Sequence, residues 1–222
     1  MKTLFSLSNL TLLLLAVSFS AIQAQSIPEV LYYRFDRNDN IVINDASGAT
    51  AQTDTAYILG ALTQDSIGQC GNALVGSGNI SSTDYVNTGW VPNLAGGSWT
   101  ISFWTNNIQP TTTLYYVFGD LNTSSFRCIT NGTAGSGNWM LRGAGLVDIL
   151  ATGGATAGPA MTTFTYNSAT AISKAYVNGI PIDTVIQTAP FLSGTGPFTV
   201  GGYAANIGLP DGGLMDEFRL YN

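Results

Sequence analysis

The stretch from residue 212 to residue 222 reads Gly212-Gly-Leu-Met-Asp-Glu-Phe-Arg-Leu-Tyr-Asn222, and the fold can be worked out from it. Its apolar side chains recur at alternate positions, which predicts a β-strand with two distinct faces. We expect one face to carry Leu214, Phe218 and Leu220, and the other to carry Met215, Arg219 and Tyr221. A strand of this kind packs its apolar face against the core of a sheet protein.

One acidic residue interrupts the apolar face of this strand. Asp216 occupies a position that is expected to point inward. A buried carboxylate without a partner costs several kcal/mol and is protonated instead. Three kinds of partner are open at this point: a cationic side chain such as Arg34, backbone N–H donors, or a bound metal ion.

A second strand, near the other end of the chain, matches the closing one. Residues 30–36 read Val-Leu-Tyr-Tyr-Arg-Phe-Asp. Sheet proteins protect their edges by pairing strands, and the first strand often pairs with the last. We therefore expect 30–36 and 214–221 to be antiparallel neighbours that close the domain.

The chain begins with the features of a secretory signal peptide. Lys2 precedes an almost wholly apolar run at residues 10–19, and small residues follow up to Ala24. This run is too short to cross a membrane, which takes about 20 residues. We expect residues 1–24 to be removed and residues 25–222 to form one secreted or cell-surface domain, without a transmembrane segment.

The composition favours an extracellular β-protein. The chain has 222 residues, a net charge of −6, only 9% charged residues and 26 glycines. An acidic chain is a poor partner for nucleic acids and anionic membranes, so neither is expected. Cys70 and Cys128 are its two cysteines, and an even number in an exported chain favours a disulfide over two buried thiols.

Short strands separated by turn residues run along the whole chain. The clearest is Ser98-Trp-Thr-Ile-Ser-Phe-Trp104, where large apolar residues alternate with hydroxyl residues until Trp104 breaks the polar face. Residues 174–183 predict a hairpin that turns at Asn178-Gly179. Residues 49–68 carry only weak signals. So many strands in one domain predict an all-β, two-sheet antiparallel sandwich.

Several of these segments resemble one family in order. The segments are Leu31-Tyr-Tyr-Arg-Phe-Asp36, Asn44-Asp-Ala-Ser-Gly48, Ser98-Trp-Thr-Ile-Ser-Phe-Trp104, Lys174-Ala-Tyr-Val-Asn-Gly179 and Asp216-Glu-Phe-Arg-Leu-Tyr221. Together they resemble the concanavalin A-like, laminin G-type jelly-roll domain of secreted and cell-surface proteins. The resemblance implies a jelly-roll sandwich with calcium at its rim. Where such domains usually carry a Trp-x-His-Val-Ala strand, this chain has Met161–Tyr166, so any role of that Trp and His is absent.

The residue types available argue against catalysis. The chain contains no histidine, which excludes His-dependent triads and His-ligated zinc. Glycoside hydrolases of the same fold carry Glu-x-Asp-x-Glu on one strand, whereas this chain has only Glu29 and Glu217 and no such strand. A glycosidase needs two carboxyl groups that face one cleft. We therefore predict a binding domain rather than an enzyme.

Calcium is the metal that oxygen ligands in irregular turns suit best. If the two ends of the domain are neighbours, Asp216 and Asp45 could converge on one ion, with Asp36 as a third ligand. The resemblance implies a similar site. The alternative, that Asp216 pairs with Arg34 or caps a neighbouring turn, remains open here.

Exposed aromatic side chains would mark a sugar site, since a ring can stack on the face of a sugar. The candidates are Trp90, which follows a glycine in loop-like sequence, and Trp139, which lies beside Asn138 and Gly137, although core packing claims most large aromatics. The expected partner is an extracellular glycan or glycoprotein. The alternative is a structural or adhesive subunit of a cell-surface assembly that binds no small ligand.

Overall fold

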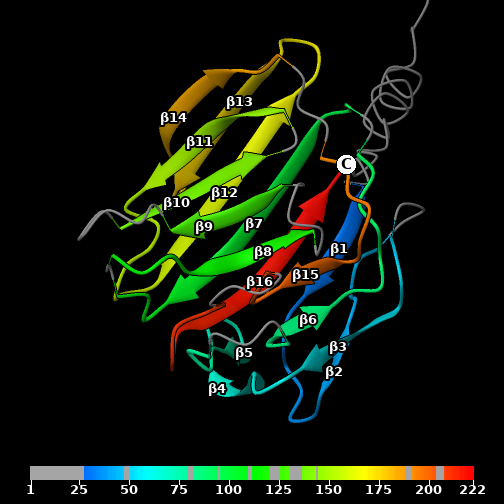
Figure 1. Cartoon of the computed structure of the whole chain (residues 1–222), viewed down its shortest axis with the longest axis vertical. Coiled ribbons are helices and arrows are strands. Elements are labelled where there is room, and N and C mark those ends of the chain that lie inside the picture. The colour runs from blue at the N-terminus through cyan, green and yellow to red at the C-terminus, as the bar shows by residue number, and fades with distance from the viewer. Residues whose placement is uncertain are drawn as a thin grey trace, which may run out of the picture.

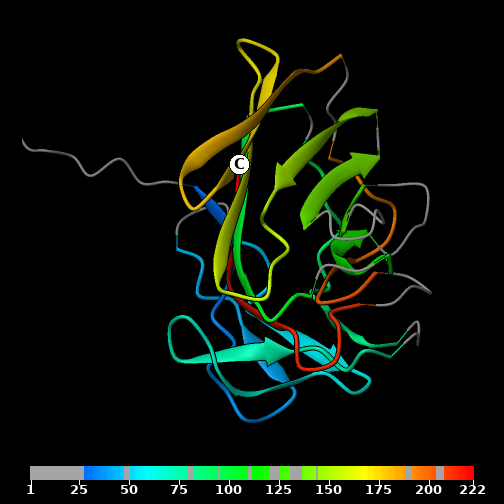
Figure 2. The ribbon, with the colours of Figure 1, turned by 90° about the vertical axis from the view of Figure 1, so that its left-hand side faces the viewer.

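The computed structural model describes residues 28–47, 51–79, 83–94, 96–109, 112–120, 126–130, 137–143, 145–188, 192–203 and 208–222. These residues form two antiparallel sheets that pack face to face (Figures 1 and 2). The predicted all-β sandwich is therefore confirmed. The predicted signal peptide lies outside the described residues, and its removal stays a prediction. Within the described ranges, no helix is long and apolar enough to span a bilayer.

Sheet A, as we name it, carries the closing strand at its centre. Its strands are β1 (Glu29–Tyr33), β4 (Thr63–Ile67), β5 (Asn72–Val75), β7 (Trp99–Asn106), β12 (Ala160–Asn167), β13 (Ile172–Val177), β14 (Ile180–Ile186) and β16 (Leu214–Tyr221). They follow the order β14-β13-β12-β7-β16-β5-β4, and β1 also pairs with β16. The first residues of β16 therefore pair with β5 and its last residues with β1.

Sheet B covers the other side of the core. Its strands are β2 (Ile41–Ile43), β3 (Thr55–Leu59), β6 (Tyr85–Asn87), β8 (Tyr116–Asp120), β9 (Arg127–Thr130), β10 (Asn138–Gly143), β11 (Leu146–Thr152) and β15 (Phe198–Val200). They follow the order β11-β10-β9-β8-β15-β6-β3-β2. β3 and β4 were not predicted from the sequence, because these short strands are rich in Thr, Ala and polar residues and depend on their neighbours for pairing.

Four phenylalanines join the two sheets at the centre of the core. Phe103 of β7 and Phe218 of β16 come from sheet A, and Phe118 of β8 and Phe198 of β15 come from sheet B, all fully buried. The ring centroids of Phe118 and Phe218 are 5.5 Å apart, and those of Phe103 and Phe118 are 5.6 Å apart. Edge-to-face contacts of this kind stabilise a core beyond simple burial. The cluster therefore packs β16 of sheet A against β8 and β15 of sheet B.

The predicted pairing of the first and last strands is confirmed. β1 and β16 are antiparallel, with Tyr33 opposite Phe218 and Tyr32 opposite Arg219. Figure 1 shows β1 in blue beside β16 in red. The predicted hairpin is also confirmed, since β13 and β14 join through Asn178 and Gly179, both with positive φ. Such a turn matches the twist of the strands that it connects.

The predicted faces of β16 were wrong in its first half. Met215 faces the core and is fully buried, whereas Leu214 lies on the outer face. The cause is a β-bulge between Asp216 and Arg219, where Glu217 adopts a positive φ of 50°. One extra residue shifts the alternation by one position, so that Phe218 and the residues after it keep their predicted faces.

The predicted disulfide between Cys70 and Cys128 is not formed. Cys70 is exposed in the turn between β4 and β5 of sheet A, and Cys128 is buried in β9 of sheet B. Both are free thiols, and burial raises the pKa of the Cys128 thiol. An even number of cysteines in an exported chain does not show whether the two residues lie close together in the fold. This is why the expectation failed.

Candidate functional site

The outer face of sheet A presents a regular array of polar side chains. β7 alternates strictly between buried and partly exposed residues, and its outward side chains are Thr100, Ser102, Trp104 and Asn106. The outward side chains of β12 are Met161, Thr163 and Thr165. Cross-strand pairing sets Ser102 beside Thr163 and Thr100 beside Thr165. Four hydroxyl residues therefore form a polar floor on two neighbouring strands.

Charged and aromatic side chains border this floor on the β16 side. Arg219 lies opposite Ser102, and its guanidinium carbon is 3.8 Å from the centroid of the Tyr32 ring. The Arg219 Nη2 donates to Glu217 Oε2 over 2.8 Å, and the Tyr32 hydroxyl donates to the same oxygen over 2.8 Å. Burial, followed by this bond to Glu217, raises the pKa of Tyr32 to about 12. These groups satisfy one another and form a rigid border.

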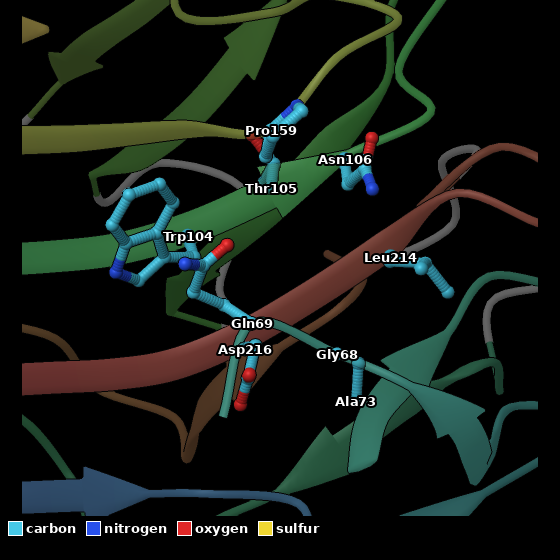
Figure 3. A pocket seen from close by; sticks show the side chains of 9 residues that line it. All are labelled: Gly68, Gln69, Ala73, Trp104, Thr105, Asn106, Pro159, Leu214 and Asp216. Carbon is cyan, nitrogen blue, oxygen red and sulfur yellow. The ribbon is translucent and has the colours of Figure 1, made fainter. Parts of the chain in front are cut away.

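A small pocket opens where β7 meets β16. Its volume is about 80 Å³, and its lining consists of Gly68, Gln69, Ala73, Trp104, Thr105, Asn106, Pro159, Leu214 and Asp216 (Figure 3). Asp216 is the cross-strand partner of Trp104, so both belong to the outer face. In Figure 3 the Gln69 side chain reaches from the β4–β5 turn toward Trp104. The pocket thus combines an aromatic ring with amide and carboxylate groups.

Asp216 is buried although it belongs to the outer face. It is only 2% exposed, because the β4–β5 turn covers it. Its Oδ2 accepts the N–H of Cys70 over 2.8 Å, and its Oδ1 accepts the N–H of Glu217 over 2.7 Å. Burial raises the pKa of Asp216 to about 6, although these backbone donors favour the charged form. Of the three partners left open by the sequence, backbone N–H groups are the ones that the structure provides.

Asp36, another predicted metal ligand, likewise accepts a backbone N–H group, at the other end of the β4–β5 turn. Asp36 Oδ1 accepts the N–H of Asn72 over 3.0 Å, and its Oδ2 pairs with Arg34 Nη2 at 2.9 Å. Asp36 and Asp216 therefore fasten the two ends of the Cys70–Asn72 segment. Each carboxylate satisfies backbone groups that would otherwise lack a partner.

The three predicted calcium ligands are not gathered into one shell. Asp45 lines a groove together with Asp36, and two cations, Arg34 and Arg37, line the same groove. Cations beside a carboxylate oppose the binding of a second cation. Within the described residues there is no group of three or more His, Cys, Asp or Glu side chains placed to hold a metal ion. The residues present therefore do not fit the calcium site that the sequence led us to expect, and the melting curve in calcium and in EDTA is its test.

The two tryptophans predicted as sugar platforms differ in exposure. Trp139 is fully buried in the core, so its assignment as a ligand platform was wrong. Trp90 is partly buried in the loop after β6 and packs edge-on against Phe198 with ring centroids 5.9 Å apart. Trp104 was not predicted as a platform from the sequence. Its position on the polar face of the alternating strand could have indicated that its ring points outward.

Comparison with known families identifies the fold. The sequence pattern described as "Concanavalin A-like lectin/glucanases superfamily" matches residues 79–222, which include β7, β12, β13 and β16. The family resemblance inferred from the motifs is confirmed. A comparison with curated proteins finds no match.

Three solved structures illustrate the similarity of fold. Domain 4 of AbnA, an extracellular arabinanase of Geobacillus stearothermophilus solved with arabinotriose, has a TM-score of 0.58 at 20% identity, over 89% of this chain and 94% of that one. The binding domain of Paraclostridial Mosquitocidal Protein 1 has a TM-score of 0.67 at 13% identity, over 87% of this chain and 48% of that one. The receptor binding domain of botulinum neurotoxin D has a TM-score of 0.61 at 16% identity, over 87% of this chain and 49% of that one. The chain thus spans about half the length of the two toxin domains.

Proposed function

We propose that this chain, which belongs to the concanavalin A-like lectin/glucanases superfamily, is a secreted, non-catalytic domain that binds glycans on the outer face of sheet A. The observation that carries the proposal is Trp104, which is partly exposed beside the amides of Gln69 and Asn106 and next to the hydroxyl floor. An aromatic ring with hydrogen-bonding groups at its edge suits a sugar, which has an apolar face and a polar rim.

The arrangement of acids favours binding over hydrolysis. The pocket contains one carboxylate, Asp216, and both of its oxygens already accept backbone N–H groups. The neighbouring acid, Glu217, is bound to Tyr32 and Arg219. Glycoside hydrolysis needs two carboxyl groups on opposite sides of the scissile bond. Neither acid is available for that chemistry in this arrangement.

The fold of the neighbours supports a binding role without identifying the ligand. Domain 4 of AbnA was solved with arabinotriose, and the two toxin structures are binding domains. Identities of 20% or less show the shared fold alone, and a shared fold does not specify a ligand. The glycan, its source and the secreted location are therefore parts of the proposal.

Replacement of Trp104 tests the proposed platform. We expect Trp104→Ala to weaken binding of a glycan identified on an array by roughly 30-fold, the equivalent of about 2 kcal/mol for a tryptophan at the centre of an interface. The ring lies outside the core, so the melting temperature should change little. The control is Trp90→Ala, because Trp90 is the platform that the sequence suggested. A loss with Trp90→Ala but not with Trp104→Ala would move the site to the loop after β6.

A structural or adhesive role remains the second candidate. Three isoleucines are exposed along the edge strand β14, namely Ile180 at 63%, Ile182 at 42% and Ile186 at 72%. Exposed apolar side chains on an edge strand are typical of contact surfaces. A broad glycan array that shows no binding above background would favour this candidate over glycan recognition.

A further inference from the structure

A larger hollow lies on the same face of sheet A, two strands away from Trp104. Its volume is about 430 Å³, and its lining consists of Thr165, Tyr166, Asn167, Thr170, Ile172, Lys174 and Tyr176. These residues come from β12, β13 and the turn that joins them. Hydroxyl, amide and phenol groups surround a single cation, Lys174.

Lys174 lacks the acidic partner that four arginines of the described chain have. Arg34, Arg37, Arg142 and Arg219 all form ion pairs with aspartate or glutamate. Arg127 lies over the ring of Tyr203. Lys174 makes no ion pair with any residue that the structure describes, although acids outnumber cations in this chain by 13 to 7.

The strands around Lys174 explain why it has no partner. The cross-strand neighbours of Lys174 are Thr165 on β12 and Thr184 on β14. β7, β12 and β13 contain no acidic residue at all. The acid of β14, Asp183, is turned toward the other sheet, where its Oδ2 accepts the N–H of Leu150 over 2.9 Å. Among the described strand residues, this part of the face therefore carries one cation and no acid.

We propose that Lys174 receives an anionic group, a carboxylate or a sulfate, of an acidic glycan, an inference that rests on the glycan-binding function proposed above. The ammonium group would form a charge-assisted bond with the anion, and the hydroxyl of Thr165 can donate to the same group.

The spacing of the two subsites suits one ligand. Trp104 pairs with Met161, which lies four residues before Thr165, and Thr165 pairs with Lys174. Strand spacing and rise place Trp104 and Lys174 roughly 17 Å apart. The hydroxyls of Ser102 and Thr163 lie between them. The sheet face can therefore accommodate a short acidic oligosaccharide, with a sugar ring on Trp104 and the anionic group at Lys174.

The test compares glycans that differ only in charge. One pair is an oligogalacturonate and its methyl ester, and the other is a sulfated galactan oligosaccharide and its desulfated form. We expect the wild-type chain to prefer the charged member of one pair by about tenfold, as one charge-assisted contact provides, and this preference to weaken at high salt. The pair that shows the preference identifies the anion.

Variants at Lys174 connect the preference to this residue. Lys174→Gln should abolish the preference, whereas Lys174→Arg should keep it. Arg142→Gln makes the same change of charge on sheet B and should have no effect. A preference that persists in Lys174→Gln, or equal affinity of the wild type for both members of each pair, would overturn the role of Lys174 while leaving glycan binding intact. Absence of binding to every glycan would overturn both proposals.

Discussion

Asp216 and Lys174 are two charged side chains on the same face of the same sheet, and their surroundings are opposite. Asp216 is 2% exposed, and the β4–β5 turn supplies N–H donors to its carboxylate. Lys174 is partly exposed in a hollow and has no ion pair within the described chain. The Asp216 carboxylate binds backbone groups of the fold, whereas the Lys174 ammonium group is available to solvent or a ligand.

The difference shows how a structural charge can be told from a binding one. A buried carboxylate that accepts backbone N–H groups stabilises the chain around it, and its loss leaves those donors unsatisfied. A cation held among hydroxyl groups contributes little to stability and is available to a partner. The sequence predicted Asp216 as a metal ligand, yet Lys174 is the better candidate for contact with a ligand.

The largest effect that tests this contrast is the loss of the Asp216 carboxylate. We expect Asp216→Ala to lower the free energy of unfolding by about 3–4 kcal/mol, because the N–H groups of Cys70 and Glu217 lose their acceptors. Urea denaturation measures the change. The exposed Asp211 provides the matched control, and Asp211→Ala should stay within about 0.5 kcal/mol of wild type. Equal effects of the two substitutions would show that the bonds from Asp216 to backbone N–H groups do not stabilise the fold.

The pH dependence of stability is the next effect in size. Burial raises the pKa of Asp216 to about 6, so between its ordinary pKa and pH 6 the folded chain holds a proton that the unfolded chain releases. Stability from this group is therefore greatest at low pH and falls as pH rises toward 6, by about 2–3 kcal/mol.

Comparison with Asp216→Asn isolates this contribution from that of the other acids. The advantage of the wild type over Asp216→Asn, measured by urea denaturation from pH 4 to pH 7, should shrink as the pH rises. A difference that stays constant or grows over this range would contradict the raised pKa.

A smaller effect is expected at Lys174. Lys174→Ala should change the free energy of unfolding by no more than about 0.5 kcal/mol, because this cation has no ion pair in the described chain to lose. The same urea denaturation serves as the measurement. A loss comparable to that of Asp216→Ala would mean that Lys174 is part of the fold, which would remove the contrast between the two charges.

Calcium has the smallest expected effect. Metal that binds only the folded chain would raise the melting temperature. Asp36 and Asp216 are occupied by backbone donors, and Arg34 and Arg37 line the groove beside Asp45. We therefore expect the same melting curve in calcium and in EDTA. A rise in calcium that disappears in Asp45→Ala would restore the metal site that the family resemblance implies.

Patterns along the chain predicted the fold more fully than the site. The alternation of β7 and the Asn178-Gly179 turn depend on near neighbours in sequence, and both are confirmed. The pairing of the first strand with the last followed from the need to cover sheet edges, and it is confirmed between residues 29–33 and 218–221. Trp139 shows the limit of this approach. Its neighbours Gly137 and Asn138 suggested an accessible ring, but its place on β10 turns the ring into the core.

The sequence by itself determined most of the strands, the hairpin turn and the sandwich, because side-chain period and turn chemistry act over a few residues. The closing pair followed from the general need to cover sheet edges. Tertiary structure alone decided which charges face each other. The bulge at Glu217 moved Asp216 to the outer face, and the β4–β5 turn, more than 140 residues away in sequence, covered it. The place of Lys174 between threonines on two neighbouring strands likewise depends on register. Such contacts join distant segments, and no local pattern encodes them.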